Sequence, residues 1–254
     1  MSRWAFTRGL RGGLSFLTRL PVRSEGSEWE AFVSRPVVFP LVGLVVGALA
    51  AVPLLAVGTL PAPTVVFGYL LAIYVLTGIH HLDGVADLGD AVVVHGDADR
   101  RREVLKDTTT GVGALLAVSV VVAGLALGGL GLTALPVAVA VAVAVAAEVG
   151  AKLGMAALAC FGTASHDGFG SQVTSALEPR AFVLPALLAL PVVVLTWPHV
   201  TAGVTLVGAL AGACLPWLWA NRNLGGVSGD VFGAANEVGR VVGLHVGVIA
   251  WTLF

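Results

Sequence analysis

The chain has 254 residues, of which 57% are hydrophobic and only 11% are charged, and its formal net charge is −1. An ordinary soluble domain is about 25% charged. Together with a mean hydropathy of +0.94, this composition excludes a typical soluble protein and predicts a membrane protein that crosses the bilayer several times. The net charge gives no basis for nucleic-acid binding.

The N-terminal segment carries arginines, among them Arg3 and Arg8, in the manner of a signal peptide. The apolar stretch that follows, 12–22, is too short for a span and is interrupted by Arg19 and Pro21. We therefore expect an interfacial amphipathic helix within a cytoplasmic segment, 1–36, rather than a cleaved signal.

Seven apolar stretches follow, and most approach the length of about 20 residues that a membrane span needs. They cover residues 37–57, 64–79, 112–131, 134–158, 181–197, 202–220 and 239–254. The second and the last are short for a span. We expect an all-α, polytopic integral membrane protein with about seven transmembrane helices, organised as a single catalytic domain over residues 1–254.

The connections between these stretches are of two kinds. The short ones contain no Lys, Arg, Asp or Glu, and they are 58–63, 131–133 and 198–201. The long ones carry nearly all of the charge, and they are 1–36, 80–111, 159–180 and 221–238. With seven spans the two kinds alternate, so the positive-inside rule places the charged side and the N-terminus in the cytoplasm and the C-terminus outside the cell membrane. Polar groups on one face are typical of a membrane enzyme, whereas a transporter places them near the bilayer midplane.

The densest group of acids follows the second apolar stretch directly. Asp83, Asp87 and Asp90 are spaced i, i+4 and i+7, so they share one face of a helix. Carboxylates so placed repel each other, which indicates a bound divalent cation, and Mg²⁺ prefers carboxylate and phosphate oxygens. We predict these three as metal ligands, with a solvated acidic loop as the alternative. His80 and His81 are candidates for a base, an outer-sphere position or a helix cap.

A basic group lies in the same long connection, at Arg100 to Lys106. Arginine binds phosphate through two donors at once, and the turn 108–113 enters a helix whose free N–H groups favour anions. We take Arg102 and Asp107 as candidates for substrate binding and Lys106 as a candidate catalytic residue. For the arginines the alternative is a positive cluster that only sets the topology.

A glycine-rich segment, 223–237, precedes the last span and repeats the first acidic pattern. Its glycines allow a turn that cradles a phosphate, Ser228 is placed to cap the next helix, and Asp230 and Glu237 share one helix face. An ordinary helix start is the alternative. The candidates here are Arg222, Gly226, Ser228 and Asn236 for substrate binding, and Asp230 and Glu237 for metal ligation.

The fourth apolar stretch contains two charged residues, Glu148 and Lys152, spaced i, i+4. Such a spacing predicts an ion pair on one helix face. We expect a structural pair, with a substrate contact as the alternative.

Five segments, taken in chain order, resemble the cobalamin synthase family of membrane enzymes. They are SFLTRLPV (15–22), FPLVG (39–43), TGIHHLDGVADLGDA (77–91), LKDTTTGVGALLA (105–117) and NLGGVSGDVFGAANE (223–237). The resemblance implies an Mg²⁺-dependent transferase that joins α-ribazole, or its 5′-phosphate, to adenosylcobinamide-GDP with release of GMP. This is the last assembly step of cobamide biosynthesis. Asp90 or His81 would then be the base, and Lys106 and Arg222 would neutralise the departing GMP.

The chain departs from the family pattern after Lys106-Asp107, where a serine, a basic residue, an apolar residue and a glycine are usual. Here Thr108 to Thr110 precede Gly111, so a basic contact is missing, and Arg102 or Arg222 is a candidate to replace it. The doubled histidine, His80-His81, leaves open which one plays the family's part.

Two other functions fit parts of the pattern. A CDP-alcohol phosphotransferase also clusters acids on adjacent helices, but its Asp-Gly-x-x-Ala-Arg run is not met at Asp83 to Asp87. A transporter or cation channel would use the aspartates as an ion path, which the one-sided placement of charge disfavours. An oligomer is compatible with the sequence, and the bilayer and the two small-molecule substrates are the expected partners.

Overall fold

The computed structural model describes residues 3–107 and 109–254, and within them the regular structure is helical, with isolated β-bridges only. The α-helices are α1 (Arg3–Leu17), α2 (Gly26–Val33), α3 (Val38–Ala50), α4 (Ala62–Thr77), α5 (His80–Val93), α6 (Ala98–Val104), α7 (Val112–Leu132), α8 (Val137–Phe161), α9 (Phe169–Ser175), α10 (Val183–Ala189), α11 (Thr201–Asn223) and α12 (Gly229–Leu253). Short 3-10 segments, η1 (Val52–Ala56), η2 (Pro179–Phe182) and η3 (Leu190–Thr196), extend α3 and flank α10. The predicted all-α class is confirmed.

In the described chain, five helical segments are long and apolar enough to cross a membrane. They are Val38–Ala56, Val112–Leu132, Val137–Phe161, Pro179–Thr196 and Thr201–Asn223. Helices α4 and α5 add a sixth if they are counted as one span, although they meet at an angle of 94°. All seven apolar stretches predicted from the sequence are helical, and the seventh forms the second half of α12, whose first half carries charged residues. The prediction of a polytopic membrane protein is therefore confirmed, with five or six candidate spans in the described chain where the sequence predicted about seven.

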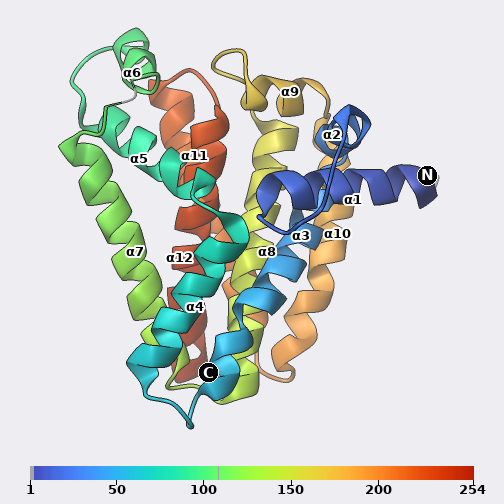
Figure 1. Cartoon of the computed structure of the whole chain (residues 1–254), viewed down its shortest axis with the longest axis vertical. Coiled ribbons are helices and arrows are strands. Elements are labelled where there is room, and N and C mark those ends of the chain that lie inside the picture. Colours follow the sequence, from blue (N-terminus) through green and yellow to red (C-terminus); the bar gives the residue numbers. More distant parts are fainter. Residues whose placement is uncertain (1–2, 108) are drawn as a thin grey trace.

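The long helices run side by side, and the short helices gather at one end of the bundle (Figure 1). There α1, α5 and α9 lie across the ends of the long helices, with α2 and α6 beside them, whereas the C-terminus lies at the opposite end. Helix α5 thus lies across the bundle (Figure 1) and belongs to none of the five helical segments given above as spans. The amphipathic helix expected within 12–22 begins earlier, at Arg3, and ends at Leu17, before the interruption by Arg19 and Pro21.

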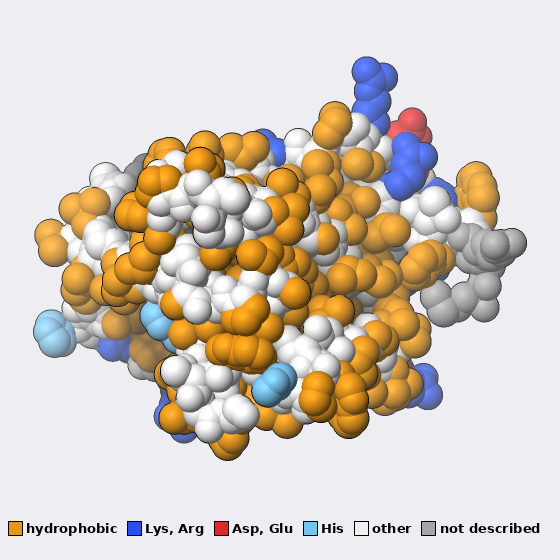
Figure 2. Space-filling model, turned by 90° about the horizontal axis from the view of Figure 1, so that it is seen from below, with side chains coloured by type: hydrophobic (Ala, Val, Ile, Leu, Met, Phe, Trp, Pro, Cys, Tyr) orange, Lys and Arg blue, Asp and Glu red, His pale blue; other side chains and the backbone are white. Residues whose placement is uncertain are grey.

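The end of the bundle that carries the C-terminus presents few charges. Figure 2 shows the molecule from that end, with hydrophobic side chains over most of the surface and Lys, Arg, Asp and Glu side chains only near its margins. Helices α1, α2, α5, α6 and α9, which belong to the charged connections, lie at the other end (Figure 1), as the lengths and compositions of the connections predict.

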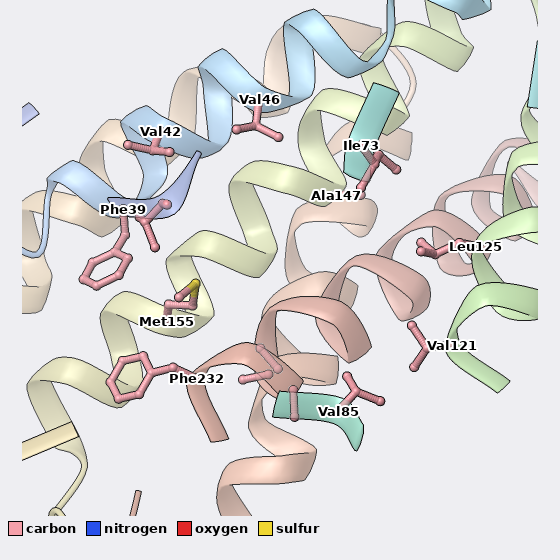
Figure 3. Packing of buried hydrophobic residues seen from close by; sticks show 14 of the residues in the cluster. Phe39, Val42, Val46, Ile73, Val85, Val121, Leu125, Ala147, Met155 and Phe232 are labelled. Carbon is pink, nitrogen blue, oxygen red and sulfur yellow. The ribbon is translucent and has the colours of Figure 1, made fainter. Parts of the chain in front are cut away.

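The core is built around α8, which is buried along most of its length. Phe39, Val42 and Val46 of α3 pack near Ala147 and Met155 of α8 (Figure 3). Small residues let the helices approach closely, as is usual for helix packing in membranes. This rigid packing fixes the ends of the helices that carry the polar groups described next.

Candidate active site at the charged end of the bundle

Helices α5 and α12 cross in backbone contact at the charged end. A Cβ atom added to Gly84 would lie 2.5 Å from the carbonyl oxygen of Asp230, and one added to Gly233 would lie 3.0 Å from the carbonyl oxygen of His81. Because a glycine faces the other helix on each side, no side chain separates the two backbones. The crossing brings Asp230 next to Asp83, although the two are far apart in the sequence.

We expect Gly84→Ala to lower both stability and activity, because the added methyl group would overlap the α12 backbone. Overpacking of this kind costs about 1–3 kcal/mol. The thermal unfolding midpoint in detergent and the turnover rate measure the two effects. Gly26→Ala is the matched control, since a Cβ at Gly26 has no atom within 4 Å. Equal unfolding midpoints and turnover rates in the two variants would show that α5 and α12 can move apart at the crossing without loss.

The acids of α5 line a cavity of about 280 Å³, which we call the acid pocket. Its walls are Asp83, Ala86, Asp87, Asp90, Leu105, Lys106, Asp107, Thr109, Thr110 and Ala114. Asp83 is exposed, and Asp87 is half-buried. Burial, and then the neighbouring charges of Asp230, Asp83 and Asp90, raise the pKa of Asp87 to about 6. The helical spacing read from the sequence is thus realised as a cluster of repelling carboxylates.

The acid pocket is not a closed metal cage. Among the described residues, no three His, Cys, Asp or Glu side chains are arranged so that they alone could hold a metal ion. In the same part of the chain, the carboxylates of Asp83 and Asp87 have no hydrogen bond or ion pair. Mg²⁺ commonly takes one or two carboxylates and completes its shell with waters and substrate phosphates. The carboxylates present therefore fit Mg²⁺ shared with a phosphate-bearing ligand.

Asp90 is held by the start of α7. One of its oxygens accepts a hydrogen bond from the Gly111 N–H at 2.7 Å, and the other accepts from the Ala114 N–H at 2.9 Å. These amides have no partner within their own helix, so the carboxylate caps α7 and ties it to α5. Asp90 thus has an anchoring role besides the metal and base roles predicted from the sequence.

Lys106 and Asp107 lie on the loop that forms the other wall of the acid pocket, and both are exposed. Asp107 accepts hydrogen bonds from the backbone N–H and the hydroxyl of Thr109, at 2.9 and 2.8 Å, and these bonds lower the pKa of Asp107. Thr108, part of the departure from the family pattern, lies outside the described residues. Lys106 is the cation that the loop brings to the pocket.

The two arginines predicted to bind substrate are placed differently. Arg102 donates to the Leu224 carbonyl at 2.6 Å and pairs with Asp99, so it fastens α6 to the end of α11. Arg222 is exposed on the last turn of α11, and in the described chain it has no hydrogen bond or ion pair. Neither residue lines the acid pocket.

The glycine-rich turn before α12 packs on a second loop. Gly226 has a φ of +155° and meets the Thr163 carbonyl so closely that a Cβ would not fit. Val227 exchanges backbone hydrogen bonds with Thr163 and Ser165 at 2.8 and 3.0 Å. The turn thus holds this loop, and Gly226 does not reach the acid pocket.

Ser228 caps α12, as predicted. Its hydroxyl accepts from the Val231 N–H at 3.5 Å and donates to Asp230 Oδ2 at 3.1 Å. The cap therefore also orients the one acid of α12 that lies at the crossing.

Glu237 lies deeper, in a cluster of charged residues that we call the buried ion network, which consists of Glu148, Lys152, Glu237 and Arg240. Asn236 lies beside this network and hydrogen-bonds to Glu237 and Lys152. Both oxygens of Glu237 accept from Arg240 Nη1 at 2.7 Å, and Arg240 Nε donates to Glu148. The predicted Glu148–Lys152 ion pair is confirmed at 3.8 Å. All four side chains are at most 1% exposed. Glu237 therefore faces Arg240 and not the acid pocket.

Sequence reasoning did not single out Arg240, which connects the two acids of this network. Its spacing of i, i+3 from Glu237 was the available signal. The partner on α8 was not visible, because only the packing of α8 against α12 joins Arg240 to Glu148.

Comparisons with known proteins decide the family. A family model described as cobalamin-5-phosphate synthase matches residues 9–248. The chain belongs to the cobalamin-5-phosphate synthase family. A relative from Halorubrum lacusprofundi, named adenosylcobinamide-GDP ribazoletransferase, is 50% identical over 96% of this chain and 98% of its own length. A relative of the same name from Halobacterium salinarum is 56% identical over 77% of this chain and 98% of its own length. Another, from Methanocella arvoryzae, is 32% identical over 97% of this chain and 97% of its own length. No solved structure matches the chain.

The resemblance found in the sequence is thus confirmed for this member of the cobalamin-5-phosphate synthase family. The match spans both acidic segments and nearly all of the membrane helices. It does not favour the CDP-alcohol phosphotransferase or transporter alternatives.

Proposed function

We propose that the protein is an adenosylcobinamide-GDP ribazoletransferase, which joins α-ribazole or its 5′-phosphate to adenosylcobinamide-GDP and releases GMP. The observation that carries the proposal is the similarity, over nearly the full length, to relatives with that name. The acid pocket supports it, because a reaction at a diphosphate needs negative charge to be neutralised and the reactants to be positioned.

Asp83, Asp87 and Asp230 are the residues that would hold Mg²⁺ against the diphosphate. Bound Mg²⁺ would neutralise the charge that develops on the phosphate oxygens during transfer. Lys106 places a positive charge at the rim of the same pocket, where it attracts the phosphate of the leaving GMP. Asp90 keeps α5 and α7 together, so the acids stay on a common wall while the substrates bind.

The charged end of the bundle is proposed to face the cytoplasm, in the cell membrane. The charged connections and the N-terminal helices share this end, and the positive-inside rule assigns it to the cytoplasmic side. The water-soluble substrate then reaches the acid pocket without crossing the bilayer, and the C-terminus lies outside.

The direct test is transfer in vitro. Purified protein in detergent is supplied with adenosylcobinamide-GDP, α-ribazole and Mg²⁺, with and without a chelator, and the products are separated by chromatography. We expect a cobamide and GMP in equal amounts, and loss of both with the chelator. Turnover of CDP-diacylglycerol in place of the corrinoid would contradict the proposal.

Binding of Mg²⁺ is expected to weaken as the pH falls through about 6, because Asp87 titrates there and a carboxylate must lose its proton to bind a metal. A raised pKa means that the proton competes with the cation at a higher pH than at an ordinary aspartate. The apparent Mg²⁺ affinity should fall by up to about tenfold per pH unit below this value. Calorimetric titration of Mg²⁺ at several pH values measures it, and Asp87→Asn should flatten the dependence. An unchanged slope in that variant would assign the titration to another group.

A further inference from the structure

A second cavity, of about 320 Å³, lies around the first residues of α5, and we call it the aromatic pocket. It is lined by Ser15, Phe16, Leu17, His80, His81, Met155, Phe169, Gly229, Phe232 and Gly233. The acid pocket shares none of these lining residues. The aromatic pocket therefore has room for a ligand group of its own.

Aromatic rings from three helices form part of its wall. Phe16 of α1 and Phe169 of α9 have ring centroids 4.9 Å apart, and Phe169 and Phe232 of α12 have centroids 5.1 Å apart. Met155 of α8 also lines the pocket. Aromatic rings and a methionine sulfur favour contact with a flat, aromatic group.

The pocket also contains one buried polar side chain, His81, which is 7% exposed. Its Nδ1 atom lies 3.1 Å from the amide nitrogen of Asn236. In the described chain its other ring nitrogen, Nε2, has no hydrogen-bond partner. His81 thus brings one unpaired polar atom to a mostly apolar cavity.

The neighbours of Asn236 determine which nitrogen of His81 carries the proton. The ammonium of Lys152 lies 2.5 Å from Asn236 Oδ1, and an ammonium can only donate. The amide oxygen of Asn236 therefore faces Lys152, and its NH₂ group faces His81 Nδ1 and Glu237 Oε1, the latter at 3.2 Å. His81 Nδ1 must accept, so the ring is neutral and its proton is on Nε2.

We propose that the aromatic pocket receives the base of the ribazole substrate, and that His81 donates a hydrogen bond from Nε2 to the base. A benzimidazole joined to ribose is flat and apolar and keeps one unsubstituted ring nitrogen, which is an acceptor. The pocket offers the complement: aromatic walls and, at His81, a buried N–H donor. This assignment rests on the proposed function, and it makes His81 a donor rather than the base considered from the sequence.

The position of α5 fits this assignment. His81 and Asp87 are six residues apart on one helix, which separates them by about 9 Å along its axis. In this assignment the base of the nucleoside lies in the aromatic pocket and its ribose hydroxyls reach toward the acid pocket. Asn236 and Lys152 act through His81 and are positioning residues.

The test compares two ligands in direct binding without adenosylcobinamide-GDP: α-ribazole and its dimethylindole riboside analogue, in which carbon replaces the acceptor nitrogen. The wild-type protein should bind α-ribazole about tenfold more tightly, because the analogue leaves the Nε2–H of His81 unpaired. His81→Phe should bind both ligands equally. His95→Phe, at an exposed histidine outside both pockets, should keep the wild-type preference.

Asn236→Asp provides a second, nearly isosteric test. A carboxylate only accepts, so His81 Nδ1 would have to donate to it, and in the neutral ring Nε2 would become the acceptor. The preference for α-ribazole should disappear although His81 is still present, and ¹⁵N NMR of labelled histidine should show the change of tautomer.

The outcomes separate this inference from the proposed function. Equal binding of the two ligands by the wild-type protein, or a preference retained in His81→Phe, would overturn the inference while ribazole transfer continued. A protein that neither binds nor transfers α-ribazole would overturn both.

Discussion

We expect Asp87→Ala to lower ribazole transfer by about a hundred- to a thousandfold, the usual cost of removing one preorganised electrostatic contact to a reacting group. Asp87 lines the acid pocket, and the charges of Asp230, Asp83 and Asp90 repel its carboxylate. Its removal takes away a proposed Mg²⁺ ligand, but it also relieves repulsion between carboxylates, so the fold should be retained. The rate of cobamide formation at saturating Mg²⁺ measures the loss.

Glu103→Gln is the matched control for that experiment. Glu103 is an exposed acid on α6 that pairs with Arg100 and does not line the acid pocket. It should keep wild-type activity. If purified, folded Asp87→Ala turned over at a rate near that of the control, the assignment of the metal site would be wrong.

Arg240→Ala is expected to destabilise the protein by about 3–5 kcal/mol, because it leaves buried charges without their partner. Arg240 binds both Glu237 and Glu148, and these three side chains are at most 1% exposed. With alanine, Lys152 would be the one cation of the buried ion network left to the two carboxylates. The thermal unfolding midpoint in detergent and the yield of folded protein in membranes measure the effect.

Arg180→Ala tests whether burial of the ion pairs is the reason for the expected loss of stability in Arg240→Ala. Arg180 also pairs with a glutamate, Glu178, at 2.7 Å, but these side chains are 85% and 66% exposed. Exposed pairs contribute about 0–1 kcal/mol, so this variant should unfold close to the wild-type temperature. Similar losses in the two variants would mean that the buried ion network is not what holds α8 and α12 together.

Local features were readable from the sequence because they depend on neighbours along the chain. Asp83, Asp87 and Asp90 are spaced i, i+4 and i+7, so helix geometry alone places them on one face. The structure shows that α5 presents this face to one pocket. The Ser228 cap needs only the three residues after it. The family resemblance depends on the same short segments.

Contacts between residues far apart in the sequence could not be predicted from the sequence. The carboxylate of Asp90 caps α7, Arg240 of α12 binds Glu148 of α8, and Gly226 packs against Thr163. Each of these residues has the chemical type expected of a ligand-binding group, but its neighbour is supplied by another helix or loop. The type of each residue indicated its chemistry, and the packing of the helices decided which partner each side chain contacts.

The amino-acid sequence by itself determined the helices, the membrane class and the gathering of charge at one end, because backbone hydrogen bonding and hydropathy act locally. Only the tertiary structure decided which of those charges share a cavity. Helices α5 and α12 meet at Gly84 and Gly233, where the absence of side chains lets the two backbones touch. That contact lies between the acid pocket and the aromatic pocket, whereas the packing of α8 against α12 assembles the buried ion network. No pattern within a single helix specifies either contact.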